Sequence, residues 1–526
     1  MAVATENPDA TRAALQLLDH GGNAVDAAVA ASLALGVVSS QSSGLGGGGF
    51  ALLYLAKEKA FHVVDFRERA PQVLDGDELL LRKKRGPSIG VPGEPAGLEL
   101  LAKRYGTKSL AEDAAPAIAL AEQGFPVGQH FRDALAISYV RDRVSASAKL
   151  SSFLYPNGSP LSLGAWVTRP ELARTLRAFG ANGAKSIYEG PTADAIVAAV
   201  HAEGGAMEKA DLLAYKVVER KPLVRTIDGR TIATMPAPSA GGMMLLETLT
   251  MFGATKASSL FAMGAGSSAL YHTLGEAMRG AVADRARLLG DPDLDPGVNV
   301  AVEGALAADQ LAARKAKIDP KKVRLAPEFK TNEQGTSHLV IADGEGNVVS
   351  LTTTVNGPFG AGVVAGDTGL VLNNELDDFS APKDVQPFGV TGPGSNRPRA
   401  LARPVSSMTP TIVLENGLPM LALGGSGGQR IATGVTQAAV CRLVFGLDPS
   451  SCVSMPRIHV GSSPEMIVDR DVPDDVRQGL LARGEVVKED TFGSPGVQMI
   501  AWDRGANGTR LFAASDPRKG GFAAAR

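Results

Sequence analysis

The alternation of apolar and polar residues predicts a β-hairpin near residue 340. Ser337 to Ala342 has the pattern of one strand and Val348 to Val355 that of its partner, with the turn Asp343-Gly344-Glu345-Gly346-Asn347 between them. The same alternation predicts four further strands, in two pairs: 50–55 with 61–66, and 410–415 with 419–424. Sheet elements are therefore expected near both ends of the chain.

Helical patterns fill most of the remaining chain. Pro8 to Asp19 and Ala24 to Val38 are expected to be helices, and Asn23 is a suitable N-cap for the second. Residues from about 95 to 310 are rich in alanine and leucine and are expected to be mostly helical. Two helices are predicted more specifically, at 273–289 and 429–445. Strands on both sides of a helical middle favour an α+β protein whose sheet is assembled from both halves.

Composition indicates an ordinary globular protein with a large core. The chain has 526 residues, of which 44% are hydrophobic and 21% charged, and its net charge is −2. This balance argues against nucleic acid as a partner. The longest apolar run, Ala27 to Val38, is too short to span a membrane. No signal peptide is recognisable.

Metal and cofactor sites are not expected. The two cysteines, Cys441 and Cys452, are too few for a disulfide framework or a zinc site. They could form one disulfide, but two reduced and partly buried thiols are the expected state. The run Asp291-Pro292-Asp293-Leu294-Asp295 resembles the start of a calcium loop. It lacks the glycine and the glutamate that such a loop needs at its sixth and twelfth positions, so calcium binding is not predicted.

Thr336, directly before the predicted hairpin, is the most informative residue for function. A threonine hydroxyl is a poor nucleophile and needs a base. If the chain were cut between Gly335 and Thr336, the new α-amine, with a pKa of about 7.7–8.0, could be that base. These residues alone favour the simpler interpretation, that Thr336 is a linker residue that precedes a strand.

A series of further motifs, in order along the chain, resembles the γ-glutamyltranspeptidases (glutathione hydrolases), which are N-terminal-nucleophile hydrolases. The resemblance extends over nearly the whole chain, and the set of motifs is far more specific than any one of its glycine runs. The motifs are Gly21-Gly22-Asn23-Ala24-Val25-Asp26-Ala27, Gly46 to Phe50, Phe66-Arg67-Glu68, Ala283-Asp284-Arg285, Thr354-Val355-Asn356, Asn373 to Phe379, Arg403 to Met408, and Gly424 to Gly428.

The resemblance implies a four-layer αββα sandwich built from a self-cleaved precursor. Residues 1–335 would form the large subunit and 336–526 the small subunit, which begins at Thr336. The two would remain together as a heterodimer. If a leader has been removed, the resemblance suggests a periplasmic or secreted protein, and otherwise a cytoplasmic one.

The resemblance also implies a role for each matched residue. Arg67 would bind the substrate's α-carboxylate with its two-pronged guanidinium, assisted by Ser406 and Ser407. Glu375, Asp378 and Asn356 would hold the α-ammonium. Thr336 would be the nucleophile and Thr354 would orient it. Gly427 and Gly428 would offer backbone N–H groups to the oxyanion.

The implied reaction begins when Thr336 attacks the γ-glutamyl carbonyl of glutathione or another γ-glutamyl compound. The γ-glutamyl-enzyme ester would then be released by water or by an amino acid or dipeptide acceptor. By the same resemblance, Thr336 would first attack the carbonyl of Gly335 and cut the precursor.

Three other interpretations remain open at this point. Gly424-Gly425-Ser426-Gly427-Gly428 fits the nucleophile elbow of a serine hydrolase, with Asp448 and His459 as the available partners. A glutaryl or cephalosporin acylase of the same superfamily would not need the acids Glu375 and Asp378. A non-catalytic binding homologue would not need Thr336. The loop from Ser380 to Ala400, in which Phe388 replaces the tyrosine of several bacterial members, is a candidate lid over the site.

Overall fold

The hairpin predicted around residue 340 lies at the centre of a seven-stranded sheet. β9 (Ser337–Ala342) pairs antiparallel with β10 (Val348–Thr354), as predicted. On its other side β9 pairs with β1 (Ala2–Thr5), which the sequence pattern did not indicate. The order is β20–β1–β9–β10–β2–β3–β6, in which the remaining strands are β20 (Phe522–Ala525), β2 (Gly48–Leu55), β3 (Ala60–Phe66) and β6 (Val218–Arg220).

A second, six-stranded sheet packs against the first. Its order is β19–β18–β14–β13–β8–β7. The predicted pair near residue 415 forms its middle. The strands are β7 (Leu223–Ile227), β8 (Arg230–Thr234), β13 (Thr411–Glu415), β14 (Leu418–Ser426), β18 (Gly496–Gly505) and β19 (Gly508–Ser515).

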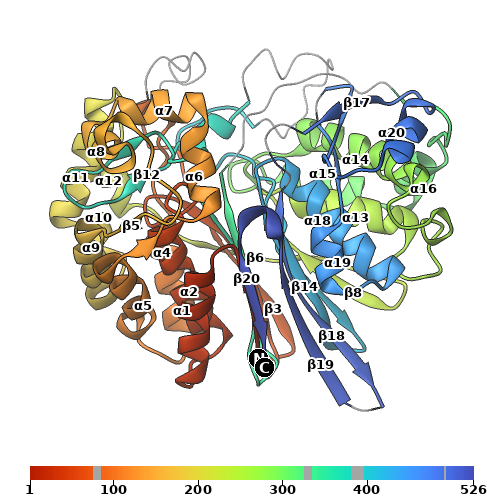
Figure 1. The fold of residues 1–526 in the computed structure, drawn as a ribbon, viewed down its shortest axis with the longest axis horizontal. Coiled ribbons are helices and arrows are strands. Elements are labelled where there is room, and N and C mark those ends of the chain that lie inside the picture. Colours follow the sequence, from red (N-terminus) through yellow and green to blue (C-terminus); the bar gives the residue numbers. More distant parts are fainter. Residues whose placement is uncertain are drawn as a thin grey trace.

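This computed structural model describes residues 1–74, 85–324, 335–380, 396–461, 463–490, 493, 495–506 and 508–526. Helices cover the outer face of each sheet, which gives the four αββα layers seen in Figure 1. The first face is covered by α1 (Pro8–Asp19), α2 (Ala24–Val38), α4 (Glu94–Tyr105) and α5 (Leu110–Gln123); the second by α13 (Gly241–Phe252), α14 (Ser268–Leu288) and α18 (Arg430–Val440).

Shorter elements complete the two helical layers. The helices are α6 (Gln129–Ala136), α7 (Ser138–Ser145), α8 (Ala148–Leu154), α9 (Pro170–Asn182), α10 (Lys185–Tyr188), α11 (Gly190–Ala202), α12 (Lys209–Leu213), α15 (Gly297–Ala305), α16 (Ala308–Lys315), α19 (Pro449–Ser454) and α20 (Asp474–Leu481). The strands are β4 (Phe125–Pro126), β5 (Trp166–Val167), β11 (Val363–Val364), β12 (Val371–Leu372), β15 (Ile458–Val460), β16 (Glu465–Val468) and β17 (Val486–Glu489).

Alternation along β9 explains why it lies between two cores. Leu339 and Ile341 pack with the helices of the first layer, whereas Val340 and Ala342 pack between the two sheets. All four are buried, so a one-residue slip would exchange the two sets without exposing either to water. The position of β9 is therefore fixed by its backbone pairing with β1 and β10 and by the residues that follow these strands in the chain.

Two helix predictions are confirmed to the residue. α1 and α2 have the predicted bounds, and Asn23 caps α2 through bonds from the N–H groups of Val25 and Asp26. α2 is buried on nearly all sides, as expected of an apolar run that is too short to cross a membrane. None of the helices in the described part of the chain is long and apolar enough to cross a bilayer.

One sequence prediction is wrong, and two elements differ from those expected. The helical middle contains a β-hairpin, β7 and β8, whose strands mix Arg and Thr with apolar residues and so lack the apolar run of a buried strand. Cys441 and Cys452 form a disulfide rather than two thiols. The helix predicted to reach Phe445 runs as α18 only to Val440 and then continues as a π-helical turn to Phe445. The candidate lid, including Phe388, lies largely outside the described residues.

The two sheets approach each other closely where a glycine faces a histidine. An ideal Cβ on Gly424 of β14 would lie 2.2 Å from Cε1 of His338 on β9. The imidazole bonds Thr352 Oγ1 at 2.8 Å and Ser350 Oγ at 3.2 Å, so it cannot swing away freely. Burial lowers the pKa of His338 to about 3, and the ring is therefore neutral.

We expect Gly424→Ala to destabilise the protein by about 1–3 kcal/mol, because overpacking must push the sheets apart. Gly304→Ala, in α15, is the matched control: nothing lies within 4 Å of its Cβ, and alanine favours a helix by up to about 1 kcal/mol. The free energy of unfolding in urea measures both. Equal stability of the two variants would mean that the sheets do not meet tightly at Gly424.

Candidate active site

Thr336 lies at the head of β9, where the central hairpin begins. Its side chain is buried, and its Oγ1 donates a hydrogen bond to the carbonyl oxygen of Gly335. Thr354, at the end of β10, has its Oγ1 3.3 Å from Thr336 Oγ1 and donates to the same Gly335 oxygen at 2.7 Å. Two hydroxyls therefore converge on one peptide carbonyl, and a donor to that oxygen polarises the carbonyl carbon.

The register of the hairpin decides which of three consecutive threonines faces Thr336. Thr353 pairs with Ser337, which places Thr354 next to Thr336. The other two hydroxyls bond elsewhere, Thr352 to His338 and Thr353 to Glu94. The assignment of Thr354 thus depends on antiparallel pairing.

Arg67 is the centre of a buried charge cluster. Its guanidinium pairs with the carboxylates of Glu375 and Asp378, the second at 2.7 Å. It also donates to the carbonyl oxygens of Pro404 at 3.2 Å and Val405 at 3.0 Å. A guanidinium presents its donors in a fixed plane, so this many partners fix its orientation.

Asn356 joins this cluster to the nucleophile strand. Its N–H donates to Thr354 Oγ1 at 2.8 Å, and its side-chain amide donates to Asp378 Oδ1 at 3.1 Å and to the carbonyl oxygen of Asn374 at 3.0 Å. Its φ of 69° lies in the left-handed region, which asparagine tolerates better than most residues. Thr354 and Asn356 thus connect Thr336 with the Arg67 cluster.

Glu68 is a further buried acid beside Arg67. Burial raises the pKa of Glu68 to about 8, and the charge of Arg67 offsets only part of that rise. Glu68 is therefore mainly protonated at neutral pH. The acids that form ion pairs with Arg67 are Glu375 and Asp378.

Ser406 and Ser407 directly follow the carbonyls that Arg67 contacts. Ser406 is tied to the second sheet, because its N–H donates to Pro238 and its Oγ accepts from the N–H of Met408. Ser407 Oγ is buried and has no hydrogen-bond partner within the described residues. Its hydroxyl is available to a ligand.

Gly427 and Gly428 form the turn between β14 and α18. Their φ angles of 126° and 63° are in the region that favours glycine. Neither backbone N–H donates a hydrogen bond to another part of the chain that the structure describes. Ser426, just before them, is linked through Lys519 to the carbonyl oxygen of Thr336, which places this turn near the head of β9.

The serine hydrolase arrangement is absent at Ser426. This serine donates to Glu6 and accepts a hydrogen bond from Lys519. His459 bonds Thr433 at 2.8 Å instead, and Asp448 caps α19. Spacing in the sequence suggested a triad that the fold does not assemble.

Two buried residues next to Thr336 were missed by sequence reasoning. Glu6 follows β1 and accepts from the N–H of His338, and Lys519 donates to the carbonyl oxygen of Thr336 at 3.1 Å. They come from opposite ends of the chain and belong to no recognisable local motif. Only the pairing of β1 with β9 and β20 brings them together.

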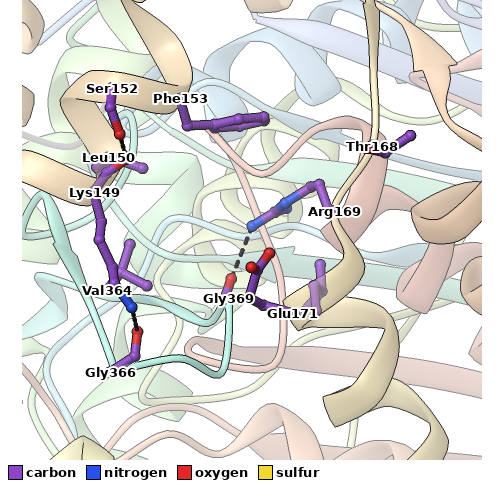
Figure 2. A pocket seen from close by; sticks show the side chains of 11 residues that line it. Lys149, Leu150, Ser152, Phe153, Thr168, Arg169, Glu171, Val364, Gly366 and Gly369 are labelled. Atoms are coloured by element: carbon purple, nitrogen blue, oxygen red, sulfur yellow. Dashed lines mark hydrogen bonds between the residues drawn. The ribbon is translucent and has the colours of Figure 1, made fainter.

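A cavity of about 260 Å³ lies elsewhere, between α8, the start of α9 and the loop after β11. Figure 2 shows its two cations already bonded to backbone oxygens, Arg169 to Gly369 and Lys149 to Gly366. None of the predicted site residues lines it. In the described ranges no group of three metal-ligating side chains occurs, and Asp293, from the calcium-like run, pairs with Arg220.

Comparison with known proteins matches this arrangement to one family. Residues 10–526 fit the family model described as gamma-glutamyltranspeptidase. The chain belongs to the γ-glutamyltranspeptidase family. It is 34% identical to a protein of Bacillus subtilis (strain 168) and 35% identical to one of Escherichia coli (strain K12). Both are named glutathione hydrolase proenzyme, and each alignment covers 98% of this chain and 90% of the relative.

A solved structure supports the fold of this family member. The structure titled cephalosporin acylase from Bacillus halodurans superposes with a TM-score of 0.86 at 27% identity, over 100% of this chain and 95% of that one. The predicted α+β, four-layer fold of an N-terminal-nucleophile hydrolase is confirmed.

We expect Arg67→Met to destabilise this family member by about 3–5 kcal/mol, because it leaves two buried carboxylates without their cation. Arg225→Met is the matched control, since Arg225 pairs with the exposed Glu303 and such a surface pair contributes about 0–1 kcal/mol. Denaturant unfolding of both variants measures the difference. If Arg67→Met were as mild as the control, the cluster would not depend on Arg67 for its charge balance.

Proposed function

We propose that this protein is a γ-glutamyltransferase with glutathione hydrolase activity and that Thr336 is its nucleophile. The observation that carries this proposal is the convergence of the Thr336 and Thr354 hydroxyls on the Gly335 carbonyl. Asn356 connects this pair to the Arg67 cluster, because it donates to both Thr354 and Asp378. The nucleophile and the charged groups of the Arg67 cluster are thereby held on neighbouring segments of the chain. The names of the two bacterial relatives agree with the proposed activity.

The first step is cleavage of the chain's own backbone. Thr336 Oγ1 attacks the carbonyl carbon of Gly335, its hydroxyl proton is transferred to the peptide nitrogen, and the C–N bond breaks, so that the nitrogen becomes the α-amine of Thr336. Water then hydrolyses the ester that joins Gly335 to Thr336 Oγ1. Thr354 stabilises the oxygen that gains charge, since it already donates to it. The products are subunits 1–335 and 336–526.

The same hydroxyl then acts on the donor. The α-amine of Thr336 takes the hydroxyl proton while Oγ1 attacks the γ-glutamyl carbonyl, and the N–H groups of Gly427 and Gly428 hold the oxyanion. The proton passes to the leaving amine, which departs and leaves a γ-glutamyl ester. Water or an acceptor amine attacks this ester and returns the proton to the hydroxyl.

The Arg67 cluster recognises the zwitterionic head of the donor. Arg67 binds the α-carboxylate with the hydroxyls of Ser406 and Ser407, while Glu375, Asp378 and Asn356 bind the α-ammonium. Without a donor, Arg67 is ion-paired with both acids. A zwitterion brings one charge of each sign, so both sides of the cluster keep an opposite partner when it binds.

This charge pattern also argues against a glutaryl or cephalosporin acylase, despite the structural neighbour of that title. A glutaryl group has the length of a γ-glutamyl group but no ammonium. Glu375 and Asp378 would then face an apolar chain and leave the site with excess negative charge. A non-catalytic homologue, in turn, gives no reason for two hydroxyls to lie on one peptide carbonyl.

Removing the nucleophile should stop maturation. Thr336→Ala should remain one uncut chain of 526 residues without turnover. Thr336→Ser keeps a hydroxyl and should still be cut. Ser426→Ala should also mature and retain turnover, which a serine hydrolase would lose altogether. Denaturing gel electrophoresis and a γ-glutamyl anilide assay follow the two properties, and two fragments from the alanine variant would refute self-cleavage by Thr336.

Asp378→Asn should separate donors by their ammonium. We expect kcat/KM for a γ-glutamyl anilide to fall by about tenfold or more, because the ammonium loses a paired anion. The value for a glutaryl anilide should hold steady or rise, since that donor has no charge to lose.

Asp377→Asn is the matched control, because it removes the same charge one residue away, at a carboxylate that accepts a hydrogen bond from the side-chain amide of Asn374. It should affect the two donors alike. Equal losses on both donors for Asp378→Asn would mean that Asp378 supports the fold or the cleavage step and does not recognise the ammonium.

A further inference from the structure

We propose that Lys519 is a positioning residue that keeps the α-amine of mature Thr336 in its neutral, proton-accepting form. This inference rests on the proposed function, because that amine exists only after cleavage. It assigns a task to a side chain at the C-terminal end of the protein that no motif in the sequence marks.

Lys519 reaches Thr336 from η6 (Pro517–Lys519), just before β20. Its ammonium donates to the carbonyl oxygen of Thr336 at 3.1 Å, and its side chain is only 7% exposed. Backbone bond lengths separate a residue's own nitrogen from its carbonyl oxygen by less than about 4 Å. The ammonium therefore lies within roughly 7 Å of the Thr336 nitrogen.

The ammonium is held in place from several sides. It donates to Ser426 Oγ, and it pairs with Glu6 at 3.4 Å. Its aliphatic stem lies against Gly496 on β18, where an ideal Cβ would be 3.0 Å from Lys519 Cδ. A buried side chain with three fixed contacts applies its charge to Thr336 at a fixed distance.

Three other titratable groups among the described residues face Lys519, namely two histidines and one carboxyl group. Burial and the charge of Lys519 lower the pKa of His130 on α6 to about 3, and burial alone does the same for His338, so both are neutral. Glu6 is the one remaining partner among the described groups that contact Lys519. Burial raises the pKa of Glu6, while the charge of Lys519 and the hydrogen bond from Ser426 oppose that rise.

The sign of the effect on the amine follows directly. A nearby cation disfavours a second cation, so the ammonium of Lys519 lowers the pKa of the Thr336 α-amine. A lower pKa leaves more of the amine as free base at neutral pH, which is the form that accepts the hydroxyl proton. None of the hydrogen bonds of Lys519 reaches Arg67, Glu375 or Asp378, so donor binding is not part of this role.

The test is the pH profile of kcat/KM for a γ-glutamyl anilide, whose acid limb reports the base of the free enzyme. Lys519→Met should move that limb upward by about one pH unit. Turnover at pH 7 should fall by up to about tenfold and recover at higher pH. Lys519→Arg keeps the charge and should restore the wild-type limb. Lys488→Met, at an exposed lysine of β17 that pairs with Glu465, is the control and should not move it.

A double variant separates the lysine's charge from that of its partner. An uncovered Glu6 carboxylate would also raise the pKa of the amine, so Glu6→Gln/Lys519→Met should show the same upward shift as Lys519→Met alone. The double variant leaves no buried carboxylate without a partner. It therefore provides the test if the single variant fails to fold.

An unmoved limb in an active Lys519→Met enzyme, or a shift that vanishes in the double variant, would overturn the inference and leave the proposed function intact. An equal shift in Lys519→Arg would also overturn it, because the cause would then be packing. A wild-type chain that is neither cut nor active would overturn the proposed function itself.

Discussion

The antiparallel register between β9 and β10 is the constraint on which the site depends. Pairing of Thr353 with Ser337 places Thr354 opposite Thr336, and the two hydroxyls then meet at the Gly335 carbonyl. In this register the neighbouring Thr353 faces the other side of the sheet, where its hydroxyl donates to the buried Glu94. Hydrogen bonding within one sheet thus selects the residue that can assist Thr336.

The two-sheet architecture brings the remaining groups to this hairpin. β2 and β3 lead into Arg67, the segment after β12 supplies Glu375 and Asp378, and β14 of the second sheet ends at the glycine turn. β1 and β20 add Glu6 and Lys519 from the two ends of the chain. Charges of both signs are consequently buried together. This is tolerated because each has an opposite partner within hydrogen-bond distance.

Local patterns were enough to predict the central hairpin and the first two helices, but not β1, which pairs with β9. The hairpin, α1 and α2 follow from alternation and capping, and the ordered motifs identified the Arg67 cluster before its geometry was known. The β7–β8 hairpin was missed because its polar strands resemble a surface segment. The contacts of Glu6 and Lys519 could not be predicted, because they depend on pairing between residues about 510 positions apart in the chain. The expectation of two reduced cysteines was wrong for a related reason, since two cysteines eleven residues apart can lie on either side of a turn or face away from each other, and the local sequence does not distinguish these cases.

The central claim is that the chain cuts itself before Thr336 and uses the new N-terminus in catalysis. Intact-mass measurement of the purified wild-type protein under denaturing conditions tests it most directly. The account predicts two polypeptides that meet at Gly335 and Thr336, with masses that together exceed that of the 526-residue chain by one water. A single uncut chain that nevertheless hydrolyses a γ-glutamyl anilide, or a cut at any other bond, would contradict the account.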